Sequence, residues 1–389
     1  MAQHVSQANR DAVLTELLLC RPTSRKELSR RTGLSPATIS RTVEMLMAEE
    51  LVSEGESFTA QGRGRREVSI DVVPDHSLVV GVDLGASATR LAVADLLARP
   101  VVARTVATPR TGSPEELAAW VADLVTTTAA ARWDGVTAVA VGVPGSVHPS
   151  ADRIDNAPNL PHVSGTTFAA QLRKRLARAV TFDNDVNLAL LGEQYFGAAR
   201  DSATAAMVNL GSGLGTALAV DHRILRGPTG IVGEFGALPF QGRRLEDFVT
   251  GNGITARAAE LGIPLDTPRA LFEDGRPELD GLRADFRLGL LTVLVAVTVS
   301  VEPSAIVVGG RIAGALRDQL ATYHELLCEH ISSPAELRTA ALDEYSGAAG
   351  GVVAALHEVY AGLGVSPAAL GRLPGANEPD FLTVLREIA

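Results

Sequence analysis

A helix-turn-helix pattern in residues 24–52 constrains the N-terminal part of this 389-residue chain more than any other feature. Ser24 and Glu27 have the spacing of a capping box, which predicts that a helix begins at Arg25. Gly33 permits a tight left-handed turn, so the helix is expected to end near it. This helix is therefore only about two turns long.

A further helix is predicted directly after the turn. Ser35 provides an N-cap, and Pro36 fits the first helical turn because its missing N–H would have no partner there. Apolar residues recur at helical spacing in this helix and in residues 9–20, which predicts one more helix before the turn. These positions are Val13, Leu14, Leu17, Leu18, Ile39, Val43, Leu46 and Met47. We therefore expect three packed helices.

The opposite face of the third predicted helix is small and polar, so it can approach the edges of DNA bases. The predicted DNA contacts on it are Ser35, Ala37, Thr38, Ser40 and Arg41. Residues 51–72 predict two short strands around a glycine-containing turn, a wing, whose arginines suit a narrow minor groove. These arginines are Arg63, Arg65 and Arg66. We predict a winged helix-turn-helix domain in residues 1–72, with a three-helix protein-interaction module as the alternative.

The net charge of −10 is unevenly distributed and does not exclude nucleic acid as a partner. Residues 1–74 carry ten basic and ten acidic residues, while the other residues carry 25 and 35. The local field governs DNA binding more than the total charge. Cys20 and Cys328 are far apart, and we find neither a signal sequence nor an uninterrupted apolar run long enough to span a bilayer. We expect a cytoplasmic protein with no membrane partner.

From residue 75 onward, apolar β-type runs alternate with helical stretches, which predicts an α/β architecture. Three glycine-rich turns follow strands, where backbone amides can approach a phosphate or a ligand edge. The predicted contacts in these turns are Asp83, Gly85, Ser87, Gly211, Ser212, Gly213, Gly215, Gly309 and Gly310. For the first turn alone an ordinary hairpin bend remains an equal alternative, because turns favour Asp and Gly.

Three such turns resemble those of the sugar kinase, hexokinase and actin fold, which is ribonuclease H-like and has two α/β lobes. The segments GRGRR, GVPGSV, APNLP, TFDNDVNLALLGEQYFGAA, GSGLG, GEFG and VVGG occur in the order found in the ROK family of repressors and sugar kinases. The chain is identified by this resemblance as a member of that family over nearly its whole length.

The resemblance implies a first lobe of residues 75–185, joined by residues 368–389, and a second lobe of residues 186–367 that carries the ligand cleft and dimer contacts. In the family's kinases the second residue of an Asn-Asp pair is the general base, and it falls on Asp185. The implied ligand-binding residues are Asn184, Asp185, Glu234, Glu246, Gly145 and Asn159. A helix-capping carboxylate is the alternative for Asp185.

The chain departs from the family's structural zinc motif. The family's histidine position holds Ala237, and its cysteines are absent, so we expect no metal site. Packing by Leu238, Phe240, Leu245 and Phe248 would have to hold the shortened loop instead. His324 and Cys328 share a predicted helix face, but an amphipathic helix explains them better than a metal site does. Ala86 also replaces a glycine of the family's first phosphate turn.

The resemblance implies a transcriptional regulator, most often a repressor of carbohydrate genes, controlled by a sugar or sugar derivative between the lobes. We expect a homodimer or higher homo-oligomer on a palindromic double-stranded operator, with no cofactor. The alternative is a sugar kinase that uses ATP and Mg²⁺ and carries a DNA-binding domain, with Asp185 as catalytic base. A third possibility is a sensor that recruits a protein instead of DNA. The ligand, the operator and the sign of the response are not encoded in recognisable motifs.

Overall fold

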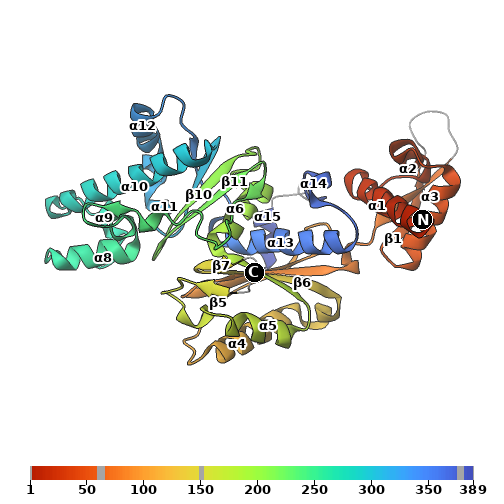
Figure 1. The fold of residues 1–389 in the computed structure, drawn as a ribbon, viewed down its shortest axis with the longest axis horizontal. Coiled ribbons are helices and arrows are strands. Elements are labelled where there is room, and N and C mark those ends of the chain that lie inside the picture. Colours follow the sequence, from red (N-terminus) through yellow and green to blue (C-terminus); the bar gives the residue numbers. More distant parts are fainter. Residues whose placement is uncertain (1, 59–65, 149–152, 375–380, 389) are drawn as a thin grey trace.

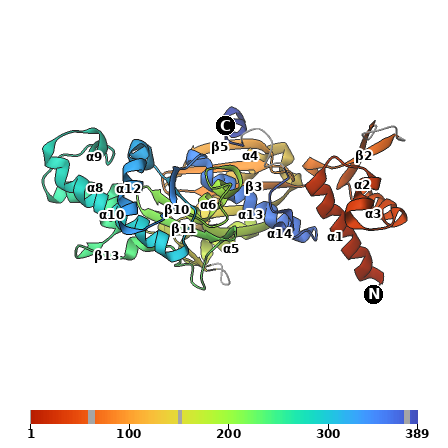
Figure 2. The same ribbon diagram turned by 90° about the horizontal axis from the view of Figure 1, so that it is seen from above.

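The computed structural model describes residues 2–58, 66–148, 153–374 and 381–388, so Arg63 and Arg65 lie outside the described residues. Figure 1 shows an N-terminal module at one end of the molecule and two α/β lobes beyond it. Seen from above, the module and the second lobe lie at opposite ends (Figure 2). The two-part fold predicted from the sequence is confirmed.

The N-terminal module consists of three helices and a two-stranded sheet. Its elements are α1 (Ala2–Cys20), α2 (Arg25–Thr32), α3 (Pro36–Ala48), β1 (Val52–Phe58) and β2 (Glu67–Val72). The first helix extends further toward the N-terminus than its apolar pattern predicts. Every predicted apolar position is buried except Met47, which is half-buried. These helices and the antiparallel pair β1–β2 form the expected winged helix-turn-helix.

The caps of α2 and α3 follow the sequence, with one correction. Ser24 accepts a hydrogen bond from the backbone N–H of Glu27 at 3.3 Å, and Gly33 ends α2 with φ of 72°. Only half of the capping box forms, because the Glu27 carboxylate accepts hydrogen bonds from Arg30 instead. Ser35 caps α3 by accepting from the backbone N–H of Thr38 at 3.2 Å.

The first lobe is a five-stranded sheet in the order β5-β4-β3-β6-β9. Its strands are β3 (Leu78–Leu84), β4 (Ala88–Ala94), β5 (Pro100–Ala107), β6 (Val136–Val143) and β9 (Ala179–Asn184). Helices α4 (Pro114–Ala129) and α5 (Thr167–Leu176) pack on one face, and the hairpin of β7 (Ser146–His148) and β8 (Arg153–Asp155) follows β6. Strands β3 and β6 are almost entirely apolar, apart from Asp83 and Thr137, because helices cover both faces of this sheet.

The second lobe repeats this design with the strand order β12-β11-β10-β15-β16. Its strands are β10 (Ala205–Leu210), β11 (Leu214–Val220), β12 (Arg223–Ile224), β15 (Ala305–Gly309) and β16 (Glu336–Thr339), and β13 (Pro239–Phe240) pairs separately with β14 (Arg243–Arg244). Its helices are α7 (Glu246–Val249), α8 (Gly251–Glu260), α9 (Ala270–Glu273), α10 (Asp280–Val301), α11 (Ala313–Leu316) and α12 (Leu320–His330). In both sheets, three antiparallel strands precede two parallel ones.

Two helices, α6 (Asp185–Phe196) and α13 (Ser346–Gly362), cross between the lobes and pack closely together. Glycine allows this contact, since a Cβ on Gly350 would lie 1.7 Å from the carbonyl oxygen of Leu188. Glycine also lets α13 approach the first sheet, since a Cβ on Gly81 of β3 would lie 2.1 Å from the carbonyl oxygen of Ala348. Because α13 lies on β3 and β6, the chain returns to the first lobe at residue 346. The family resemblance implied that the chain returns to the first lobe only at residue 368, so the return occurs earlier than expected.

The C-terminal segment connects α13 with the N-terminal module. Helix α14 (Pro367–Leu370) contacts α1, while α15 (Phe381–Ile388) packs on β5 and stacks Phe381 on Phe196 with ring centroids 4.1 Å apart. Arg10 of α1 donates a hydrogen bond to the carbonyl oxygen of Leu363 at 2.8 Å. The apolar core of the module is thus continuous with that of the first lobe.

One helical stretch in the described residues, Pro277–Val301, is long and apolar enough to cross a membrane. Charged residues interrupt it, among them Asp285 and Arg287, so it is not an uninterrupted apolar run of that length. Its side chains Phe286, Leu290 and Leu294 are buried in the core of the second lobe. A core helix has the same length and composition as a membrane span when its buried face is wide, so this feature is weak evidence for a membrane.

Candidate functional site

Four carboxylates, which we call the acidic cluster, gather where the lobes meet: Asp83, Asp185, Glu234 and Glu246. Asp83 lies near the end of β3, and Asp185 is the first residue of α6. The other two come from the second lobe, on either side of the β13–β14 hairpin. Their charges interact along a chain from Asp83 to Asp185, then to Glu234 and Glu246. The structure therefore brings four of the predicted site residues together.

Three carboxyl groups of the acidic cluster have pKa values above their ordinary range. Burial raises the pKa of Asp185 to about 7, and the charges of Asp83 and Glu234 add to this effect. Burial also raises the pKa of Asp83 to about 6, while Arg90 opposes the shift. Burial and the charge of Glu246 raise the pKa of Glu234. A carboxyl group whose pKa lies near 7, such as that of Asp185, can both donate and accept hydrogen bonds with the hydroxyl groups of a ligand.

Asn184 is the N-cap of α6, and most of its amide is used within the protein. Its Oδ1 accepts from the backbone N–H groups of Val186 and Asn187 at 2.9 and 3.2 Å. Its Nδ2 donates to the carbonyl oxygen of Gly145 at 3.0 Å, leaving one N–H for a ligand. Gly145 has φ of 99°, and a Cβ there would lie 2.3 Å from a carbonyl oxygen. Asn184 is therefore the N-cap that fixes the position of Asp185, whose own Oδ1 also accepts a hydrogen bond from the backbone N–H of Val186 at 2.9 Å.

Several residues of this region were not found by sequence reasoning. Ser146 donates a hydrogen bond to Glu234 at 3.5 Å and so joins the two lobes. Asp183 accepts hydrogen bonds from Asn187 at 2.9 Å and from Arg226 at 2.8 Å. Ser146 lies inside the GVPGSV segment shared with the ROK family, and this segment could have indicated it as a site residue. Nothing in the sequence pairs Asp183 with Arg226, because 43 residues separate them.

The second glycine turn, residues 211–215, lies near the start of α6. A Cβ on Gly213 would lie 3.7 Å from Nδ2 of Asn159, which places this predicted ligand residue beside the second turn. Gly215 approaches the side chain of Val186, the residue after Asp185. These contacts bring the second turn to the start of α6.

The remaining glycine turns are shaped by their own neighbours. Gly310 has φ of 89°, and a Cβ there would lie 2.4 Å from the carbonyl oxygen of Leu210. In the first turn, Thr108 donates a hydrogen bond to the carbonyl oxygen of Gly85 at 2.7 Å. Ala86 and Ser87 of this turn are exposed. Its Ser87 hydroxyl is therefore open to a ligand, with the methyl group of Ala86 beside it.

The loop that lacks the zinc motif is held by aromatic packing. Phe240 packs edge-on against Phe248 with ring centroids 4.8 Å apart, and the Arg257 guanidinium lies 4.0 Å from the centroid of the Phe248 ring. Leu245 is buried as expected, but Leu238 is 37% exposed and therefore contributes less to this packing. Within the described ranges, no group of three or more His, Cys, Asp or Glu side chains is placed to hold a metal ion.

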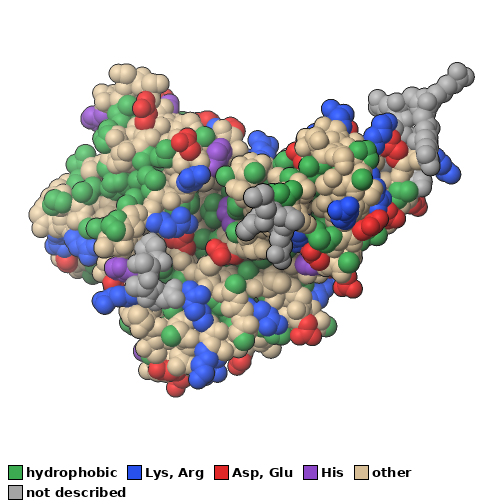
Figure 3. All heavy atoms as spheres, turned by 45° about the vertical axis from the view of Figure 1, so that its right-hand side comes forward, with side chains coloured by type: hydrophobic (Ala, Val, Ile, Leu, Met, Phe, Trp, Pro, Cys, Tyr) green, Lys and Arg blue, Asp and Glu red, His purple; other side chains and the backbone are tan. Residues whose placement is uncertain are grey.

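The predicted DNA-binding face of α3 is open to solvent. Ser35, Ala37 and Arg41 are exposed, while Thr38 and Ser40 are half-buried. Within the described part of the module, the other arginines form ion pairs with carboxylates, and Arg41 and Arg66 do not. Figure 3 shows basic and acidic side chains interspersed over this end of the molecule. These two unpaired cations lie on the face and wing where the sequence predicts DNA contacts.

Asp185→Asn is expected to change how stability depends on pH. The pKa of Asp185 is raised in the folded protein, so the folded state binds more protons than the unfolded chain between about pH 4 and pH 7. The free energy of unfolding therefore falls as pH rises through this window. We expect the free energy of unfolding of Asp185→Asn to match that of the wild type near pH 4 and to exceed it by a few kcal/mol at pH 8, since a difference of one pKa unit corresponds to about 1.4 kcal/mol. Urea denaturation at several pH values measures this difference.

The exposed Asp123 of α4 supplies the control, since Asp123→Asn removes a carboxylate that does not interact with the acidic cluster. Parallel pH profiles for the wild type and Asp185→Asn would contradict the role assigned to burial.

The fold and the acidic cluster define a class of proteins in which a winged helix-turn-helix is joined to a two-lobed sugar-kinase-like domain. Residues 79–358 match the ROK family, and residues 12–53 match a winged helix-turn-helix DNA-binding family. The chain belongs to the ROK family.

Two relatives of this chain are transcriptional regulators. The xylose repressor of Caldicellulosiruptor bescii is 27% identical over 236 residues, which cover 60% of this chain and 58% of the relative. The transcriptional dual regulator NagC of Escherichia coli is 26% identical over 239 residues, which cover 60% and 57%. The chain thus matches just under three fifths of the length of these relatives.

Solved structures show the same fold in regulators and in kinases. A ROK family transcriptional regulator, a homologue of the E. coli MLC protein, has a TM-score of 0.75 and 21% identity and covers 94% of this chain and 99% of its own. The ROK hexokinase of Thermus thermophilus has a TM-score of 0.63 and 25% identity, covering 72% and 99%. Of these two matches, the regulator's covers both the N-terminal module and the lobes.

Proposed function

We propose that this protein is a DNA-binding transcriptional regulator whose ligand, a sugar or sugar derivative, binds at the acidic cluster. The observation that carries this proposal is the course of α13, which connects the cluster with the DNA-binding module. At its start, Gly347 lies against Asp83, where a Cβ would be 2.8 Å from the carboxyl carbon. Beyond its end, Arg10 of α1 binds the carbonyl oxygen of Leu363. A 17-residue helix spans about 25 Å, so movement at one end displaces the other.

The names of the relatives support a sugar ligand and a repressing function, since xylose and N-acetylglucosamine repressors match this chain. The chemistry of the cluster agrees, because carboxyl groups with raised pKa values bind hydroxyl groups in both directions. A ligand changes DNA affinity only if it binds the two arrangements of the lobes with different affinity. We propose α13 as the element whose position differs between them.

Arg41→Ala is expected to weaken DNA binding strongly, because Arg41 is an exposed and unpaired cation on the predicted recognition helix. A fragment selected from a random DNA pool with the wild-type protein serves as the probe. We expect the affinity to fall about ten- to one-hundredfold in a gel shift, as loss of one base or phosphate contact requires. Arg175→Ala, an exposed arginine on α5, is the matched control and should bind normally. Unchanged binding by Arg41→Ala would favour a module that binds protein.

We propose in addition that two chains pair around a two-fold axis and bind a palindromic operator, since winged modules read half-sites one or more DNA turns apart. Leu288 and Val299 support pairing, because they are large, apolar and exposed on α10. Analytical ultracentrifugation of the full chain measures the assembly, and a monomer at micromolar concentration would contradict it.

A sugar kinase with an attached DNA-binding module is the second candidate, supported by Asp83 and Asp185 and by the hexokinase match. The amides of the Gly211–Gly215 turn would hold nucleotide phosphates, and Asp83 would face the hydrated Mg²⁺. ATP would supply the phosphoryl group, while Asp185 would accept the proton of a sugar hydroxyl. Sugar-dependent ADP release that disappears in Asp185→Asn would establish this activity. We expect none, because the xylose repressor and NagC, two relatives of this chain, are transcriptional regulators.

A further inference from the structure

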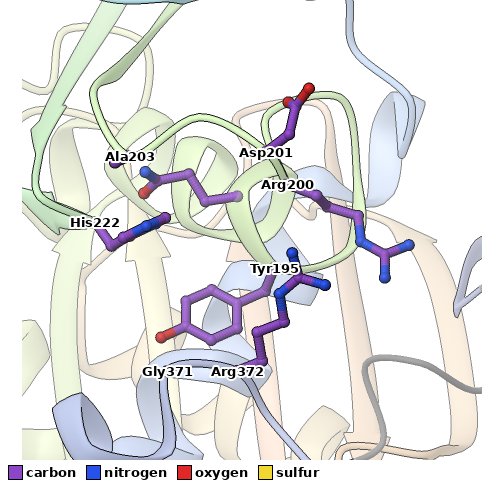
Figure 4. Close-up of a pocket in the computed structure, with 8 residues that line it drawn as sticks. Tyr195, Arg200, Asp201, Ala203, His222, Gly371 and Arg372 are labelled. Atoms are coloured by element: carbon purple, nitrogen blue, oxygen red, sulfur yellow. The ribbon is translucent and has the colours of Figure 1, made fainter.

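A second cavity lies apart from the acidic cluster, where α6 ends. It has a volume of about 180 Å³, smaller than sites for drug-sized ligands, and therefore excludes a nucleotide or a disaccharide. Its lining residues are Gln194, Tyr195, Arg200, Asp201, Ala203, His222, Gly371 and Arg372. They come from the end of α6, from the connections that flank β10 and β11, and from the segment after α14 (Figure 4). None of them belongs to the acidic cluster.

The charges around this second cavity favour an anion. Arg200 and Arg372 bring guanidinium groups to it, and His222 adds an imidazole. The lining carboxylate, Asp201, points away from Tyr195 and Arg372 in Figure 4 and forms an ion pair with Arg338 at 2.5 Å. Arg372 has no ion pair within the described ranges, so its charge is available to a ligand.

A buried polar atom in the wall of the second cavity lacks a partner. Gln194 is only 5% exposed, and its Oε1 accepts no hydrogen bond within the described structure. Its Nε2 has only a long contact of 3.4 Å with the carbonyl oxygen of Ser202. A buried amide oxygen without a donor is costly, so it favours a ligand that donates a hydrogen bond. The Tyr195 hydroxyl is already paired with His357 at 3.1 Å.

We propose that the second cavity binds a small organic anion that carries a hydroxyl or amino group close to its phosphate or carboxylate. Arg372 binds the anionic group, and Gln194 accepts a hydrogen bond from the neighbouring donor. This site is separate from the acidic cluster and does not depend on whether the cluster binds a sugar.

The second cavity is connected to the DNA-binding module through α14. Arg372 lies two residues beyond α14, and α14 contacts α1. Gln194 belongs to α6, which starts at the acidic cluster. A ligand held by both residues therefore ties the segment beside α1 to the helix that carries Asp185. The second site is a place where a metabolite can change the response to the first ligand.

Titration calorimetry of the full chain with glycerol 3-phosphate and with lactate tests this proposal, since the two probes separate the phosphate from the carboxylate form. Matched sodium chloride is the blank. Arg372→Gln replaces an exposed side chain, so folding is preserved, and we expect about tenfold weaker binding of whichever probe the wild type binds. Gln194→Met should weaken binding of the organic probe. Binding of inorganic phosphate, which is measured alongside, should be less affected by this substitution.

Arg132→Gln, an exposed arginine of the first lobe, is the charge control and should bind as the wild type does. Absence of binding by both probes at about 10 mM, or equal binding by Arg372→Gln and the wild type, overturns the proposal. DNA binding of the same samples is measured in parallel, so a failed second site is distinguishable from a failed regulator.

Discussion

Gly350→Ala is expected to lower the free energy of unfolding by about 3 kcal/mol or more, the largest stability effect that the fold implies. A Cβ on Gly350 would lie 1.7 Å from the carbonyl oxygen of Leu188 and 3.0 Å from the backbone nitrogen of Gly192. Both atoms belong to the backbone of α6, so neither can rotate away. Helices α6 and α13 would have to separate, which would disturb the contact between the lobes. Urea denaturation of the full chain measures the loss.

Gly362→Ala is the matched control for this substitution, because Gly362 lies in the same helix and a Cβ there meets no atom within 4 Å. Alanine has the higher helix propensity, so we expect a gain of about 0.5–1 kcal/mol. Equal stability of the two variants would contradict the close packing of α6 against α13.

Asp185→Ala is expected to weaken sugar binding about one-hundredfold, the largest functional effect at the acidic cluster. Asp185 occupies the first position of α6, and its carboxyl group interacts with Asp83 and Glu234. Removing it deletes a hydrogen-bonding group that is both donor and acceptor at neutral pH, and leaves a ligand hydroxyl without a partner. A thermal-shift screen with xylose, glucose, N-acetylglucosamine and their phosphates first identifies the bound ligand, since binding to the folded state raises its stability.

Calorimetry with that ligand then compares the wild type, Asp185→Ala and the control Asp123→Ala, which alters an exposed carboxylate on α4. We expect the control to bind normally. Retention of full affinity by Asp185→Ala would remove the acidic cluster from the binding site.

Local patterns in the sequence were sufficient for the N-terminal module. Ser24, Gly33 and Ser35 act through the backbone within a few residues, so their spacing alone predicts where α2 and α3 begin and end. The second and third glycine turns also follow strands as expected, because a turn depends mainly on its own residues. The family resemblance then supplied the acidic cluster, whose members are far apart in the chain.

Contacts between segments that are distant in the chain could not be predicted from the sequence. Helix α13 is rich in glycine and alanine and buried on several sides, so its pattern has no polar face that would show which sheet it covers. Its return to the first lobe was consequently placed too late. The roles of Asn184 and Arg226 were hidden for a similar reason, since each depends on partners brought near by folding: Gly145 for one and Asp183 for the other.

The central claim is that the acidic cluster and the DNA-binding module are coupled through α13. Fluorescence anisotropy of the selected DNA fragment, with and without the sugar that gives the largest thermal shift, tests it most directly. We expect the sugar to change the DNA affinity at least about fivefold, as an allosteric coupling requires, and we expect Asp185→Ala to bind DNA without responding to the sugar. The same DNA affinity with and without a sugar that binds the protein would contradict the claim.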